Sequence, residues 1–142
     1  MSGKYLLFAH TFFRVMGKKN LERRKQERML FPSFYAKHVN FIKEHKLRCA
    51  ECGERLIGDV SEVAHILNKS IFKSVSTEDE NVIYLCGWKS GNNCHSNFDN
   101  YGLENFKKML IYHNICDKFL YLKEIVKEDI NFKTMERFTK DG

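Results

Sequence analysis

The sequence predicts an α+β fold in which a small β region containing cysteines lies between helical flanks. Three patterns lead to this prediction: helix-forming stretches at 14–30, 33–46 and 103–129, short strand-like segments at 60–66 and 81–86, and two cysteine pairs around these segments. A chain of 142 residues is the size of one domain and can bury a core without disulfides. Hydrophobic residues at 43% and charged residues at 30% are typical of a globular domain.

The N-terminal flank is predicted to contain two helices. Residues 14–30 combine good helix formers with dense positive charge. Pro32 predicts a break, and Ser33 can cap a second helix over 33–46 whose apolar residues recur every three or four positions. We expect the first helix to be exposed and the second to be packed.

The C-terminal flank, 103–129, carries an apolar stripe that indicates a helix, with Asn114 as an expected interruption. Cys116 lies on this stripe, so we expect a buried thiol there. Within a single compact domain, the chain then divides into a basic helical segment, a central core and a C-terminal helical segment, at 1–47, 48–102 and 103–142.

Charge is unevenly distributed along the chain. The formal net charge is +6, but residues 1–48 hold 12 basic and 3 acidic side chains, whereas residues 49–142 hold 12 and 15. A basic first third followed by a mildly acidic remainder indicates a polyanionic partner, of which nucleic acid is the first candidate. A solvated basic helix without a partner has the same composition. We see no transmembrane window and no signal-peptide pattern, and therefore expect no membrane partner and a cytoplasmic location.

Four of the five cysteines form two pairs, Cys49-x2-Cys52 and Cys86-x7-Cys94. Four thiolates from two knuckles suit a tetrahedral structural zinc ion, Zn²⁺, although seven residues between the second pair is a loose spacing. The alternative is a redox-active first pair with Cys86 and Cys94 as core residues, but no βαβ pattern surrounds the CxxC. A Cys2His2 zinc finger is excluded because no histidine follows His65 at 69–71.

Two histidines and one aspartate remain as candidates for chemistry. His95 directly follows a cysteine of the second pair, and Asp99 lies one helical turn later, so the two side chains share a face and can bind one divalent cation. His65 ends the first predicted strand, and its imidazole can accept a proton from water near neutral pH. A base, a metal and basic surroundings are what hydrolysis of a phosphodiester requires.

The order and spacing of these elements resemble the HNH nucleases, the ββα-metal or His-Me finger group, in the subset with a four-cysteine zinc site. The resemblance covers residues 49–99 and is carried by the knuckle Cys49/Cys52, the strand 62–66, the segment 80–86 and Cys94-His95-x3-Asp99. It implies a treble-clef-like ββα-metal core that contains zinc. The small, basic format looks like phage-encoded members, for which the location would be the host cytoplasm.

The resemblance also implies roles for individual residues. His65 matches the strand histidine that acts as general base, and Asn81 matches the asparagine that braces the loop holding that histidine. His95 and Asp99 match the ligands of a catalytic cation, Mg²⁺ or Mn²⁺. The implied activity is that of a metal-dependent DNA endonuclease producing 5′-phosphate and 3′-hydroxyl ends.

One position departs from the family pattern. Many members have Asp or His directly before the base histidine as a further metal ligand, whereas this chain has Ala64. Water and phosphate oxygens can complete the shell, or Glu62 can contribute from the same strand face. A catalytically inactive, zinc-dependent nucleic-acid-binding module is the alternative function, and a zinc-stabilised protein-interaction domain is a third class.

DNA is the expected partner, with phosphate contacts supplied by a group of basic residues near the N-terminus and two after the base histidine. These residues are Lys18, Lys19, Arg23, Arg24, Lys25, Arg28, Lys69 and Lys73. Such contacts set affinity and its salt dependence rather than sequence choice. We see no sequence-recognition module, so a homodimer or a partner protein is a candidate source of specificity. Trp88 can stack on a base or cover the zinc site.

Overall fold

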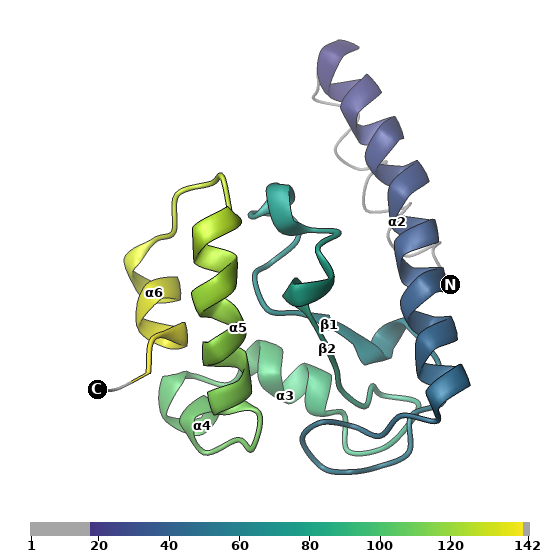
Figure 1. Ribbon diagram of the computed structural model, residues 1–142, viewed down its shortest axis with the longest axis vertical. Helices are drawn as coiled ribbons and strands as arrows, with labels where there is room; N and C mark the ends of the chain where they lie inside the picture. Colours follow the sequence, from purple (N-terminus) through teal and green to yellow (C-terminus); the bar gives the residue numbers. More distant parts are fainter. Residues whose placement is uncertain (1–17, 141–142) are drawn as a thin grey trace.

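A computed structural model describes residues 18–140, with side chains from residue 31 onward, and shows an α+β fold. This part of the chain contains a two-stranded sheet and five α-helices (Figure 1): α2 (Lys18–His45), β1 (Val63–His65), β2 (Val82–Tyr84), α3 (Cys94–Asn100), α4 (Leu103–Lys107), α5 (Tyr112–Ile125) and α6 (Phe132–Phe138). The sheet lies between α2 and α5 in Figure 1, and α6 packs beside α5. No helix among the described residues is long and apolar enough to cross a membrane.

Helix α2 is continuous over 28 residues, so the predicted break at Pro32 is wrong. Proline removes one backbone donor, but its fixed φ is compatible with a helix, and the lost hydrogen bond is offset when the following turns are well packed. Tyr35 and Ile42 are each 1% exposed, and Phe34 and Val39 are also buried. Packing of these side chains against the sheet holds the C-terminal half of α2 in place.

The sheet is a short antiparallel pair, with Ala64 opposite Ile83 and His65 opposite Val82. Both strands lie within their predicted segments but are only three residues long, because each is preceded by a 3-10 turn, Val60–Glu62 and Asp79–Asn81. The Ser61 carbonyl, just before β1, accepts a hydrogen bond from His95 in the first turn of α3 at 2.6 Å, so β1 and the start of α3 lie in one region of the molecule.

Glu62 lies in the turn before β1 and is fully buried. Its carboxylate accepts hydrogen bonds from the backbone N–H groups of Ile57 (2.9 Å), Gly58 (2.7 Å) and Asp59 (2.9 Å). Both oxygens are therefore engaged with the 57–59 backbone. The alternative in which Glu62 supplies a metal ligand in place of Ala64 would require its carboxylate to leave these three N–H groups.

The C-terminal region differs from the prediction in three respects. The helical stretch breaks at 108–111, between α4 and α5, and Asn114 lies inside α5 instead of interrupting it. The break coincides with a hydrogen bond from the Ile111 N–H to the Glu51 carboxylate at 3.0 Å, which ties the start of α5 to the first cysteine knuckle. The sequence analysis missed α6, which begins where the Asn131 side chain accepts the Thr134 N–H.

Candidate metal and phosphodiester site

The four paired cysteines come together in space. The sulfurs of Cys49, Cys52, Cys86 and Cys94 all lie within 4.8 Å of one another, and the Cys52 and Cys86 sulfurs are 3.6 Å apart. Two ligands of a tetrahedral thiolate site with metal–sulfur bonds of about 2.3 Å are separated by about 3.8 Å. The donor set therefore fits a closed four-thiolate metal site. Cys116 is buried and outside this cluster, as predicted.

Backbone turns bring each cysteine into position. Gly53, at φ +79°, reverses the chain after Cys52, and its N–H donates to the Cys49 carbonyl at 3.0 Å. At the second knuckle the Cys94 N–H points at the Cys86 sulfur at 3.3 Å. Burial raises the pKa of the Cys94 thiol, so this sulfur ionises only when a cation neutralises it. A metal ion held by the four cysteines would supply that cation.

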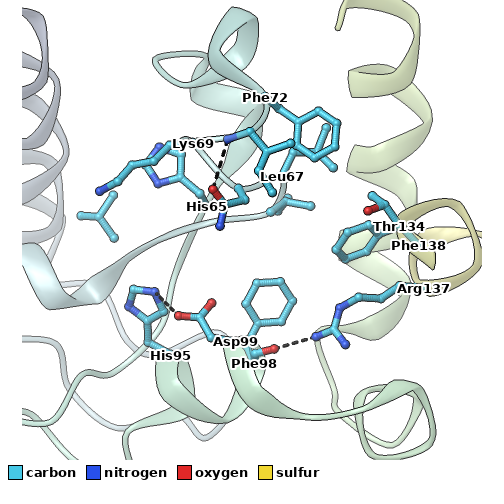
Figure 2. Close-up of a pocket in the computed structure, with 14 residues that line it drawn as sticks. His65, Leu67, Lys69, Phe72, His95, Phe98, Asp99, Thr134, Arg137 and Phe138 are labelled. Atoms are coloured by element: carbon cyan, nitrogen blue, oxygen red, sulfur yellow. Dashed lines mark hydrogen bonds and ion pairs between the residues drawn. The ribbon is translucent and has the colours of Figure 1, made fainter. Parts of the chain in front are cut away.

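A cavity of about 530 Å³ lies between β1, α3 and α6 (Figure 2). The predicted base His65 and the predicted ligands His95 and Asp99 all line it, together with Lys69 and Arg137. The fold thus brings together side chains that lie far apart in the sequence, from His65 to Arg137. In Figure 2, His65 and Lys69 face His95 and Asp99 across the cavity.

His65 is held by one hydrogen bond and by aromatic packing. Its Nε2 donates to the Ser76 carbonyl at 2.8 Å, which leaves Nδ1 as the ring nitrogen with a lone pair. The ring packs against Phe34 and Tyr35 of α2 at centroid distances of 5.6 and 6.1 Å. Burial lowers the pKa of His65 to about 4, with a further contribution from His95, so the imidazole is neutral near pH 7.

His95 and Asp99 form a paired donor set on α3. The Nδ1 of His95 donates to the Ser61 carbonyl at 2.6 Å, so Nε2 is the ring nitrogen that faces the Asp99 carboxylate, 3.3 Å away. Two acceptors are stable at this distance only with a proton or a cation between them. A carbonyl that orients a histidine in this way is the usual support of a metal ligand. The pair therefore fits a divalent cation, with Ala64 offering no third ligand.

Gly87 leaves room for Ser61, whose carbonyl holds the His95 ring. A Cβ at position 87 would collide with the Ser61 side chain, and would lie 3.0 Å from the Ser61 carbonyl oxygen that holds His95. The residue after Cys86 therefore has to be small for Ser61 to keep its place.

Asn81 is fully buried beneath the segment that follows His65. Its Oδ1 accepts the Leu67 N–H at 2.7 Å, and its Nδ2 donates to the carbonyls of Leu67 and Val75 at 3.0 and 3.2 Å. One amide thus ties together both ends of the segment between His65 and Ser76. Losing such buried partners costs about 1–3 kcal/mol each.

The predicted phosphate-binding residues differ in where they lie relative to the cavity. Lys69 lines the cavity, donates to the Tyr35 hydroxyl at 2.9 Å and has its pKa lowered to about 7 by burial. Lys73 lies in the 3-10 turn Lys73–Val75 and does not line the cavity. Lys18, Lys19, Arg23, Arg24, Lys25 and Arg28 lie on the α2 backbone, but their side chains are outside the described residues. Trp88 is 67% exposed, with the Lys89 ammonium 5.0 Å from its ring centroid.

Arg137 is the cavity residue that the sequence analysis missed. It comes from α6, and its guanidinium lies on the Asp99 side of the cavity (Figure 2). The pKa of Asp99 is raised by burial, while the charges of His95, Arg137 and Lys69 act in the opposite direction. The pattern Phe132, Met135 and Phe138 after Asn131 is the sequence signal that could have revealed α6.

Comparison of the chain with protein-family models, with curated proteins and with solved structures gives no match. A functional assignment therefore rests on the side chains that line the cavity and on the cysteine cluster.

We expect the purified protein to carry about one equivalent of tightly bound metal, with zinc as the natural occupant of four thiolates. Cys86→Ser should lose that metal and much of the fold, because structural zinc supplies about 10–16 kcal/mol in small domains, against a net stability of about 5–15 kcal/mol. Cys116→Ala is the matched control and should retain the metal. Elemental analysis with thermal unfolding checks this; full stability with less than half an equivalent of metal would contradict it.

We expect the His65 imidazole to titrate near pH 4 instead of the ordinary value of about 6.5. Since the folded-state pKa is lowered, His65 stabilises the fold fully above pH 6.5, and this contribution is lost as the pH falls toward 4. NMR of the histidine ring protons, with His65→Gln to assign the signal, measures the pKa directly. A His65 midpoint at pH 6 or above would contradict the burial argument.

Proposed function

We propose that this protein is a zinc-stabilised, metal-dependent DNA endonuclease of the HNH type. The observation that carries the proposal is the convergence of His65, His95 and Asp99 on one cavity, with a neutral base and a paired cation-binding set lying opposite each other. The order β1, β2, α3 and the four-cysteine cluster support the same reading.

His65 acts as general base in the proposed reaction. Its Nδ1 lone pair takes a proton from a water molecule, and the water oxygen forms a bond to phosphorus as the bond to the 3′ oxygen breaks. The products are a 5′-phosphate and a 3′-hydroxyl end. Positioned proton transfer of this kind contributes about 10²–10⁴-fold to rate.

His95 and Asp99 would hold Mg²⁺ or Mn²⁺. When bound, such an ion polarises the phosphate and stabilises charge on the leaving oxygen. The Ser61 carbonyl keeps the His95 Nε2 available as a ligand, and Asn81 keeps the His65 segment in place. Lys69 lines the wall of the cavity where a phosphodiester would lie, and its protonated form would attract the phosphate.

A non-catalytic nucleic-acid-binding module is the second candidate function. The observation that favours it is Ala64, which removes a ligand found in many HNH nucleases and leaves two protein donors for the catalytic cation. In that case the chain would bind DNA without cleaving it. A zinc-stabilised protein-interaction domain, the third class, would neither bind nor cleave DNA.

We expect the zinc-loaded protein to nick supercoiled plasmid DNA in the presence of Mg²⁺ or Mn²⁺, and DNA ligase to reseal the nicks because of their end chemistry. His65→Ala should reduce the rate at least about 100-fold, and His95→Ala should abolish the response to added metal. His113→Ala, an exposed histidine on α5 that does not line the cavity, is the matched control. Each variant is checked for zinc content and circular dichroism.

Equal cleavage by wild type and His65→Ala would overturn the proposed mechanism. DNA binding without cleavage by the wild type would instead support the non-catalytic module. Linear, branched and single-stranded substrates, assayed side by side, identify the form of DNA that the site accepts.

A further inference from the structure

Arg137 makes an unusual set of contacts for a residue near the end of the chain. Its Nη1 donates to the Tyr101 carbonyl and its Nη2 to the Phe98 carbonyl, both at 2.6 Å. Phe98 lies in the last turn of α3, and Tyr101 directly follows the helix. The last carbonyls of a helix have no partners within it and carry partial negative charge, so a guanidinium is a favourable cap.

Aromatic rings hold the Arg137 guanidinium in place. Its central carbon is 4.5 Å from the ring centroid of Phe106, and Phe98 and Phe138 lie at 5.4 and 5.6 Å. Stacking on rings and donation to two acceptors at once are properties of the planar guanidinium that a lysine ammonium does not reproduce. The contact therefore requires arginine specifically.

The two carbonyls flank Asp99 in the sequence. Asp99 is the α3 carboxylate that faces His95 Nε2 at 3.3 Å, and His95 itself is fixed at the other end of the helix by the Ser61 carbonyl. Arg137 thus ties α6 to the backbone on both sides of Asp99. Rotation of this last turn would carry the carboxylate away from His95.

We propose that Arg137 is a positioning residue that holds Asp99 in place as a ligand of the catalytic cation. The inference rests on the cation site within the proposed function, but it does not depend on DNA cleavage. Arg137 acts through the α3 backbone, and its loss is expected to weaken metal binding even in the absence of any substrate.

The test is Mn²⁺ affinity, measured by electron paramagnetic resonance of free Mn²⁺ with the full-length, zinc-loaded chain. We expect Arg137→Ala to bind Mn²⁺ at least about 10-fold more weakly than wild type, the usual effect of losing a residue that supports a metal ligand. Arg137→Lys should recover only part of the affinity. Added methylguanidinium at millimolar concentration should partly restore Arg137→Ala. Lys133→Ala, which removes an exposed charge from the same helix, should bind as wild type does.

Wild-type Mn²⁺ affinity in a folded Arg137→Ala variant would overturn the inference. If that variant does not fold, unchanged affinity in Arg137→Lys would overturn it equally, and so would the absence of Mn²⁺ binding by the wild type. Plasmid cleavage separates this inference from the proposed function. If the wild type cleaves DNA but Mn²⁺ binding does not depend on Arg137, the proposed function stands and the inference falls. If Mn²⁺ binding depends on Arg137 but no DNA is cleaved, the inference stands and the proposed function falls.

Discussion

The four-cysteine cluster is the constraint on which the rest of the structure depends. It joins the chain after α2, the end of β2 and the start of α3, which are separated by up to 45 positions in the sequence. The His95 N–H donates to the Cys86 carbonyl at 3.1 Å, and the Ala50 N–H donates to the Tyr84 carbonyl at 3.1 Å. A two-stranded sheet of three-residue strands is too small to fix these segments alone. Metal binding by the cysteines would fix the direction in which α3 leaves the sheet.

Two helices support the side chains of the cavity, α2 by packing behind His65 and α6 by lining the cavity itself. α2 packs Phe34 and Tyr35 against His65 and lowers its pKa by burial, while α6 holds the end of α3 through Arg137. The proposed base and the proposed cation-binding pair are thus supported by different parts of the fold. A small core can in this way hold its side chains rigidly, because the aromatic residues of the flanks supply the packing that the sheet lacks.

The sequence predicted the parts of the site that depend on local spacing. The pairing of His95 with Asp99 follows from one helical turn, and the knuckle at Cys49 and Cys52 follows from its CxxC spacing and the glycine after it. The α+β class and the convergence of the cysteines followed from the same patterns. Continuity of α2 through Pro32 depends on packing against distant residues, which no local pattern records.

Long-range contacts account for the remaining differences. Glu62 looked available as a ligand from strand alternation, but the turn at 57–59 takes both of its oxygens. Arg137 was missed because α6 is short and because only the fold brings the Phe98 and Tyr101 carbonyls to its guanidinium. Asn81 was expected to brace a loop on resemblance alone, and its three hydrogen bonds across the His65–Ser76 segment show how one amide can do so.

The most direct measurement is anomalous diffraction from crystals of the zinc-loaded protein soaked in Mn²⁺. Data collected at both absorption edges separate the two metals. The proposed site requires one zinc peak among the four cysteine sulfurs and a separate manganese peak between His95 Nε2 and the Asp99 carboxylate, on the side facing His65. Zinc at the cysteines with no manganese at His95 and Asp99 would contradict the metal-dependent mechanism.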